Sequence, residues 1–217
     1  KERLEQLQTL VNDGKVEAMA NWQSADQGFR AIVFDKHLYY PLFSKNTDKL
    51  PFTWSPMMFD YDTKDRSSEV MFVDDLQAYI NSPKQLPQLN NYHIYLMRNP
   101  SSKNKGLGFA LAGNFYPDFL LWLVHKQTGK QYLTVIDPKG IRNMSVDDAK
   151  INLYKEIKTI ESQAGGDLVL NSFILSVTPF SEMVDKSVSA DKLKERNVLF
   201  MLDNKQYLDD MFERILN

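Results

Sequence analysis

The feature that most constrains this chain is a pair of apolar segments joined by a short polar turn. Phe119 to Val124 is an unbroken apolar run, and Tyr132 to Ile136 is a second, shorter apolar segment. Between them, Gln127-Thr128-Gly129-Lys130 has the composition of a hairpin turn, so the segments are predicted to pair as antiparallel strands. Such a hairpin brings Asp118, which precedes the first strand, beside Asp137, which follows the second.

These strand ends carry residues with a chemical use. In a strand, Asp137 and Lys139 point to the same face because side chains repeat every two residues. Two neighbouring carboxylates repel each other unless a cation lies between them, and Mg²⁺ prefers oxygen ligands. A bound Mg²⁺ activates water, and a nearby lysine orients or deprotonates that water or offsets developing charge. The pattern therefore predicts a site for phosphodiester hydrolysis.

The rest of the chain supplies further strands and helices. Residues 68–81 carry a wide apolar face that ends before Pro83, which predicts a helix, and residues 146–161 have the pattern of a long amphipathic helix. Strands in the middle of the chain with helices on both sides indicate an α/β fold, a central mixed β-sheet flanked by α-helices. The other predicted elements are strands at 29–34, 92–98, 106–112, 168–177 and 197–202 and a final helix at 206–216.

The hairpin resembles the motif of the PD-(D/E)XK nuclease superfamily, with Pro117-Asp118 as its first half and Asp137-Pro138-Lys139 as its second. The resemblance implies a restriction endonuclease-like core with the element order αβββαβ. It implies that Asp118 and Asp137 bind Mg²⁺, with Mn²⁺ as a substitute, and that Lys139 acts on the attacking water. It also implies that Glu69, at the start of the helix before the hairpin, and the carbonyl of Pro138 complete the metal site.

A narrower resemblance covers about residues 30 to 142. The chain is similar there to the C-terminal nuclease domain of type III restriction-like, helicase-coupled bacterial proteins, through the segments Asp35 to Leu42, Ile94 to Asn99, Phe115 to Trp122 and Ile136 to Gly140. No Gly-x-x-x-x-Gly-Lys-Ser/Thr loop occurs, so the resemblance implies an ATPase region N-terminal of Lys1. We therefore expect residues 1–28 to be a helical lead-in and residues 29–217 to be the nuclease domain.

The composition limits the partners. The net charge is −2 over 217 residues, whereas an independent nucleic-acid-binding domain usually has a basic surplus, so DNA contacts are expected to be local or shared with the helicase region. Candidate DNA contacts are Arg98, Lys103, Lys105 and Arg142. The absence of cysteine fits a cytoplasmic protein, and no apolar run is long enough to cross a membrane.

The expected function is that of a Mg²⁺-dependent endonuclease acting on double-stranded DNA in a restriction or phage-defence system, with a dimer for double-strand cleavage. One alternative is a non-catalytic DNA-binding or assembly module that retains the fold. Others are a hydrolase of RNA or small phosphoesters, and a partner-binding domain with an accidental motif. Asp137-Pro138-Lys139-Gly140 also has the composition of a simple strand-end turn, and Glu69 is favoured by the helix dipole whatever its role.

Overall fold

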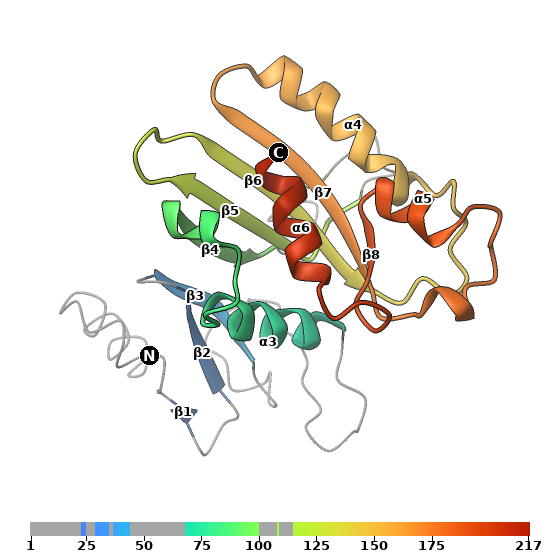
Figure 1. Ribbon diagram of the computed structural model, residues 1–217, viewed down its shortest axis with the longest axis horizontal. Helices are drawn as coiled ribbons and strands as arrows, with labels where there is room; N and C mark the ends of the chain where they lie inside the picture. Colours follow the sequence, from blue (N-terminus) through green and yellow to red (C-terminus); the bar gives the residue numbers. More distant parts are fainter. Residues whose placement is uncertain (1–22, 25–28, 35–36, 44–67, 100–107, 109–114) are drawn as a thin grey trace.

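The computed structural model of the protein describes residues 23–24, 29–34, 37–43, 68–99, 108 and 115–217 (Figure 1). Within these residues the strands form two sheets. The smaller sheet contains β1 (Gln23–Ser24), β2 (Phe29–Phe34) and β3 (His37–Phe43), paired antiparallel in that order. The predicted strand at 29–34 is therefore confirmed as β2.

The larger sheet has the order β4-β5-β6-β7-β8. Its strands are β4 (Tyr92–Arg98), β5 (Phe119–His125), β6 (Gln131–Lys139), β7 (Leu168–Ser176) and β8 (Val198–Phe200). Strands β4, β5 and β6 pair antiparallel, whereas β6, β7 and β8 pair parallel. The sheet is therefore mixed, as the sequence predicts.

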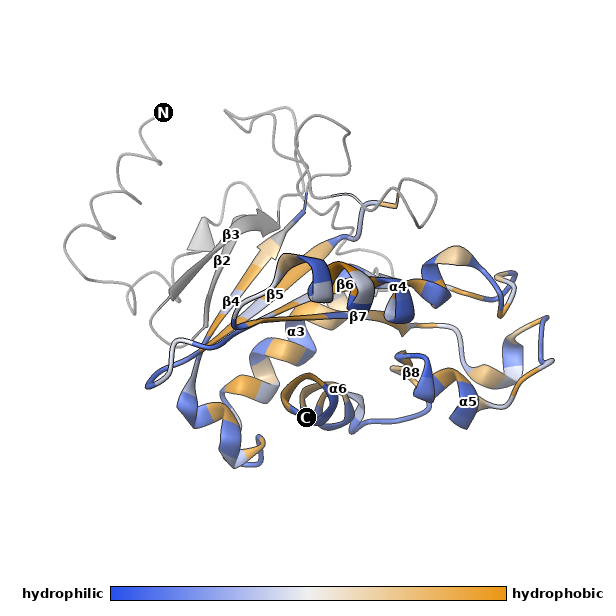
Figure 2. Cartoon of the chain, turned by 90° about the horizontal axis from the view of Figure 1, so that it is seen from above, coloured by the Kyte–Doolittle hydropathy of each residue, from blue (hydrophilic) through white to orange (hydrophobic). Residues whose placement is uncertain are grey.

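Helices cover both faces of this sheet (Figures 1 and 2). Helices α3 (Ser68–Ile80) and α6 (Tyr207–Leu216) pack on one face, where Phe72, Leu121 and Phe212 belong to the largest buried cluster. Helix α4 (Ala149–Ala164) packs on the other face through Leu153 and Ile157. The order α3-β4-β5-β6-α4-β7 follows from these bounds.

The predicted hairpin is confirmed. Strand β5 pairs with β6 from Phe119 opposite Ile136 to Val124 opposite Gln131, and Gly129 adopts a φ of 72° in the turn. This left-handed conformation favours glycine, which explains the residue at that position. Strand β6 continues three residues beyond the predicted end at Ile136, because Asp137, Pro138 and Lys139 pair with β7.

Other boundaries differ from the prediction. Helix α4 begins at Ala149 rather than at residue 146, since the side chain of Asp148 accepts a hydrogen bond from the backbone N–H of Lys150 and caps the helix. A short helix, α5 (Ala190–Glu195), and the 3-10 helices at Pro87–Asn91 and Phe180–Glu182 were not predicted, because each is too short to show a periodic pattern. The predicted strand at 106–112 and the helical lead-in lie outside the described residues, apart from Gly108 and β1.

Candidate active site

The ends of β5 and β6 bring the predicted aspartates together. Phe119 lies opposite Ile136, so one further step along the antiparallel register places Asp118 opposite Asp137. Asp118 also lies close enough to Lys139 to raise the pKa of that lysine by electrostatic attraction. The structure therefore brings Asp118, Asp137 and Lys139 together at one end of the β5–β6 hairpin, with Asp118 directly before β5 and the other two at the end of β6.

Asp137 is almost fully enclosed, with 5% of its surface exposed. Its Oδ2 atom lies 3.0 Å from Lys139 Nζ, and no aligned hydrogen bond reaches that oxygen. Burial alone would lower the pKa of Lys139, but the ion pair with Asp137 outweighs burial and raises it. Lys139 is therefore held as an ammonium, and Asp137 keeps a buried lone pair that could accept a cation.

The backbone next to Asp118 is fixed by Asn99, a buried residue directly after β4. The backbone N–H of Asn99 donates to the carbonyl of Asp118 at 2.8 Å. Its side-chain Nδ2 donates to the carbonyl of Pro117 at 2.8 Å. These two hydrogen bonds hold Pro117-Asp118 against the end of β4, so the position of the Asp118 backbone depends on the junction between β4 and β5.

The Pro138 carbonyl lies on the side of β6 that faces Asp118. Successive carbonyls in a strand alternate in direction, and the carbonyl of Lys139 accepts from Val177 N–H on the β7 side. The Pro138 oxygen accepts a hydrogen bond of 2.8 Å from Ser68 Oγ. A carbonyl oxygen has two lone pairs, so this contact leaves one for another partner.

The contact between Ser68 and Pro138 brings the first turn of α3 to the end of β6. Glu69 directly follows Ser68, the residue that makes this contact. Among the described residues, however, no group of three or more His, Asp or Glu side chains is arranged to hold a metal ion. The structure does not join Glu69 to Asp118 and Asp137 in such a group, and its part in metal binding stays a prediction.

Two carboxylates and a carbonyl nevertheless fit a Mg²⁺ ion. Mg²⁺ in phosphate-processing sites is usually held by one or two carboxylates, with water and substrate phosphate as the other ligands. Asp137 Oδ2 is buried, lies 3.0 Å from Lys139 Nζ and receives no aligned hydrogen bond, so this oxygen keeps the capacity to bind a metal ion. Asp118, Asp137 and the Pro138 carbonyl are the residues that would hold such an ion.

The structure adds one residue that the motif does not contain. Lys150, in the first turn of α4, lies near enough to Lys139 and Asp137 for the charges of both to act on it. Its Nζ lies 5.1 Å from the ring centroid of Phe115. Burial and the charge of Lys139 lower the pKa of Lys150. The only sequence signal was a lysine shortly after a helix cap, which is common on protein surfaces.

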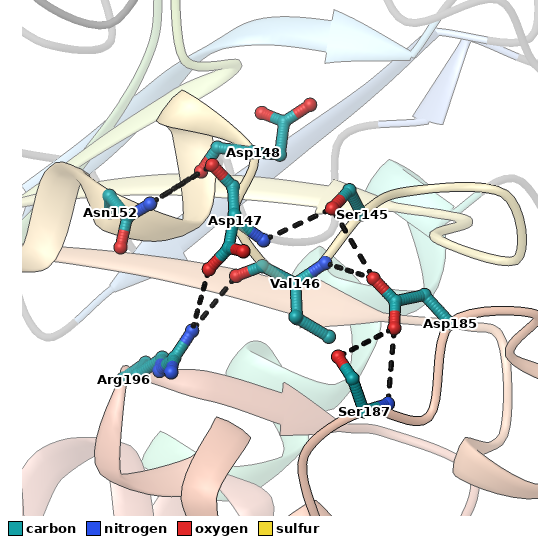
Figure 3. Close-up of polar contacts among 8 residues, drawn as sticks. All are labelled: Ser145, Val146, Asp147, Asp148, Asn152, Asp185, Ser187 and Arg196. Atoms are coloured by element: carbon teal, nitrogen blue, oxygen red, sulfur yellow. Dashed lines mark hydrogen bonds and ion pairs between the residues drawn. The ribbon is translucent and has the colours of Figure 1, made fainter.

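The segment between β6 and α4 is held by a network of polar contacts (Figure 3). Asp185 Oδ2 accepts from Val146 N–H at 2.9 Å, and Arg196 Nη1 donates to the carbonyl of Val146 at 2.9 Å. At the start of the same segment, Ile141 N–H donates to Thr178 Oγ1 at 3.0 Å. These contacts tie residues 141–148 to the segments after β7 and so fix the start of α4, where Lys150 lies.

The predicted DNA contacts are only partly described. Arg142 is exposed in the loop after β6, and its carbonyl accepts from Val184 N–H at 2.9 Å. Arg98 is the last residue of β4 and is paired with Phe119, but its side chain is outside the description. Lys103 and Lys105 also lie outside the described residues. DNA binding by all four stays a prediction.

The face of the sheet that carries Asp118 and Asp137 is accessible over β4 and β5. Trp122 shares this face with Asp118 by strand alternation and has 42% of its surface exposed. Its register partner Tyr95 and the neighbouring Met97 are also exposed. Helix α4 packs over the β6 and β7 side, so the aspartates lie between a covered and an open part of the sheet.

Comparisons with protein-family models, with curated proteins and with solved structures find no match for this chain. Among the described residues, no helix has the length and apolarity needed to cross a membrane.

Proposed function

We propose that this protein is a Mg²⁺-dependent nuclease that hydrolyses phosphodiester bonds in DNA. The observation that carries the proposal is the buried Asp137 carboxylate, in contact with Lys139 and placed by strand register opposite Asp118. The order α3-β4-β5-β6-α4-β7 supports the restriction endonuclease-like core, since the motif resemblance implies the same αβββαβ order. The wider role in a helicase-coupled restriction or phage-defence protein is part of this proposal and depends on the resemblance alone.

The roles of the residues follow from their charges and positions. Asp118 and Asp137 hold the metal ion, with the Pro138 carbonyl and Glu69 as further oxygen donors. A bound Mg²⁺ ion supplies Lewis-acid stabilisation of the phosphoryl oxygens and lowers the pKa of a bound water. Lys139 stays protonated because of Asp137, so it orients the attacking water and stabilises negative charge on the phosphate rather than removing a proton.

The overall reaction adds one water across one phosphodiester bond. The water oxygen forms a new bond to phosphorus, and the bond from phosphorus to the leaving sugar oxygen breaks. One proton of the water leaves to solvent during attack, and the departing alkoxide takes up a proton. Such in-line displacement requires stabilisation of charge on the phosphoryl group, which the cationic side of this site provides.

The test is cleavage of a supercoiled plasmid by the 217-residue chain with and without Mg²⁺. We expect cleavage to require Mg²⁺ and to fall by at least about 100-fold in Asp118→Asn, Asp137→Asn and Lys139→Met. Asp191→Asn, which changes an exposed aspartate of α5, is the matched control and should cleave normally. Thermal unfolding checks that each variant is folded.

Full activity in Asp118→Asn or Lys139→Met would refute the assignment of the site. Wild-type protein that binds DNA but does not cleave it with Mg²⁺ or Mn²⁺ would favour the non-catalytic module. Cleavage of RNA in preference to DNA would show that RNA is the substrate, and the assignment of the site residues would stand.

A further inference from the structure

The cations of the site come from two different elements. Lys139 lies at the end of β6, on the face where Val135 packs against Leu153 of α4. Lys150 lies in the first turn of that helix, near enough for the charges of Lys139 and Asp137 to act on it. The loop that connects them is held to Thr178, Asp185 and Arg196. The fold therefore holds the start of α4, and Lys150 with it, near the end of β6.

The position of Lys150 is unfavourable for the isolated protein in three ways. A positive charge in the first turn of a helix opposes the helix dipole. A second ammonium beside Lys139 is repelled by it, and partial burial disfavours the charged form. Residues that break several local rules at once are expected mainly at functional sites, where a ligand compensates for the cost. An anion at this point would relieve both the repulsion and the loss of hydration.

From this arrangement we infer that Lys150 is a phosphate-binding residue of the active site, which holds the scissile phosphodiester together with Lys139. The inference depends on the proposed nuclease function and extends it with a residue outside the motif. The site then takes an anion of the phosphodiester class, with one ammonium from the sheet and one from the helix on the same phosphate.

The charges of the site agree with this assignment. Asp118 and Asp137 contribute −2 and the two lysines contribute +2, so the protein part is neutral when each group is ionised. One Mg²⁺ brings the site to +2, and a phosphodiester with an attacking hydroxide carries −2. Without Lys150, the two aspartates, Lys139, Mg²⁺ and the phosphodiester with its hydroxide would carry a net charge of about −1. A net charge is costly in a partly buried site.

The aromatic ring of Phe115 sets the direction of the Lys150 side chain. The ammonium lies 5.1 Å from the ring centroid, which is within the range of a cation–π contact. Phe115 is buried and packs in the cluster that contains Leu120 and Leu153. A ring fixed in this way limits the freedom of Lys150, so less conformational entropy is lost when a phosphate binds.

The test compares Lys150→Met, Lys150→Arg and Lys155→Met in the full chain. Lys155 is an exposed lysine of the same helix and serves as the matched control. The probe is a fluorescent 20-base-pair DNA duplex with Ca²⁺ in place of Mg²⁺, and its affinity is measured between about 50 and 300 mM salt. Each phosphate contact contributes a slope of about −0.9 to the dependence of log K on log salt.

We expect Lys150→Met to reduce the magnitude of this slope by about 0.9, which corresponds to about eightfold weaker binding at 0.1 M salt. Lys150→Arg should keep the wild-type slope, and Lys155→Met should change it little. With Mg²⁺, cleavage by Lys150→Met should fall by about 100- to 1000-fold, as for the loss of one donor to a developing oxyanion. In the absence of DNA, Lys150→Met should unfold at the same temperature as wild type or higher, because an unfavourable cation has been removed.

The possible failures separate the two proposals. Wild-type cleavage with an unchanged slope and rate in Lys150→Met would overturn the role of Lys150 and leave the nuclease function standing. A lower unfolding temperature of Lys150→Met with an unchanged slope would show that the lysine is structural. Wild-type protein that neither binds nor cleaves the duplex would overturn both proposals, whereas binding with the predicted slope change but no cleavage would support only the phosphate site.

Discussion

The ion pair between Asp137 and Lys139 should be measurable as a coupling energy in the metal-free protein. At 3.0 Å, two unit charges attract by about 5.5 kcal/mol at an effective dielectric constant of 20. Desolvation of the buried Asp137 carboxylate offsets much of this attraction. The side-chain exposures are 6% for Asp137 and 26% for Lys139, so the pair lies between a buried and a surface ion pair. We therefore expect a net coupling of about 2 kcal/mol.

The assay is a double-mutant cycle with Asp137→Asn, Lys139→Met and the double variant, unfolded by urea without divalent ions at pH 7. The single variants should each lose stability, and the double variant should lose less than the sum. A matched cycle on Lys158 and Glu161 serves as the control. That pair has a similar distance of 2.9 Å but a more exposed lysine, so its coupling should be at most about 0.5 kcal/mol.

The coupling should also depend on pH in one direction. The pKa of Lys139 is raised in the folded protein by Asp137, so the folded state retains this proton more strongly than the unfolded chain. The stabilisation is therefore complete below the ordinary lysine pKa of about 10.4 and is lost as the pH rises through the raised value. A coupling below about 0.5 kcal/mol at pH 7, or one equal to that of the control pair, would refute the electrostatic argument.

Two further predictions concern the supports of the site. Asn99→Ala removes the donor to the Pro117 carbonyl and should lower the free energy of unfolding in urea by about 1 to 3 kcal/mol. The rate of cleavage should also fall, because Asp118 is less well held, and an unchanged rate would show that Asn99 does not position Asp118. Asp185 has a pKa lowered to about 2, chiefly by the hydrogen bond from Val146 N–H, so its stabilisation is complete above about pH 4 and is lost as the pH falls toward 2. Asp185→Asn should therefore be less stable than wild type at pH 6 by thermal unfolding, and the difference should shrink as the pH falls from 4 to 2; a difference that stays constant over this range would contradict this reason.

Much of the sheet could be predicted because its strands carry strong local signals. The apolar run of β5 and the turn at Gly129 define the hairpin without knowledge of the rest of the chain. The same local logic places Asp118 beside Asp137, since only an antiparallel register and strand alternation are needed. The extension of β6 through Lys139 could not be predicted, because it depends on pairing with β7, which begins 29 residues after Lys139 (168 − 139).

Pro138 and Glu69 lie in local patterns that do not show their place in the site. Pro138 has the composition of a turn, yet its missing N–H is tolerated because β5 pairs with β6 only as far as Ile136. The hydrogen bond from Ser68 to its carbonyl links residues that are 70 positions apart. No local pattern contains this contact. It brings the first turn of α3 to the site, whereas the role of Glu69 still depends on the resemblance.

Lys150 shows why part of a site can be invisible in the sequence and evident in the fold. Its neighbours along the chain, Asp148 and Ala149, explain only the start of a helix. Its role becomes visible only from the charge of Lys139, which acts on it across space. The loop between the two lysines is fixed by hydrogen bonds to Thr178 and Asp185. A lysine that opposes a helix dipole, faces a second ammonium and is partly buried lowers the stability of the empty protein. The fold nevertheless holds Lys150 in this place. The positive charge that is concentrated there, from two ammonium groups and the helix N-terminus, is unfavourable in the empty protein but attracts a phosphate.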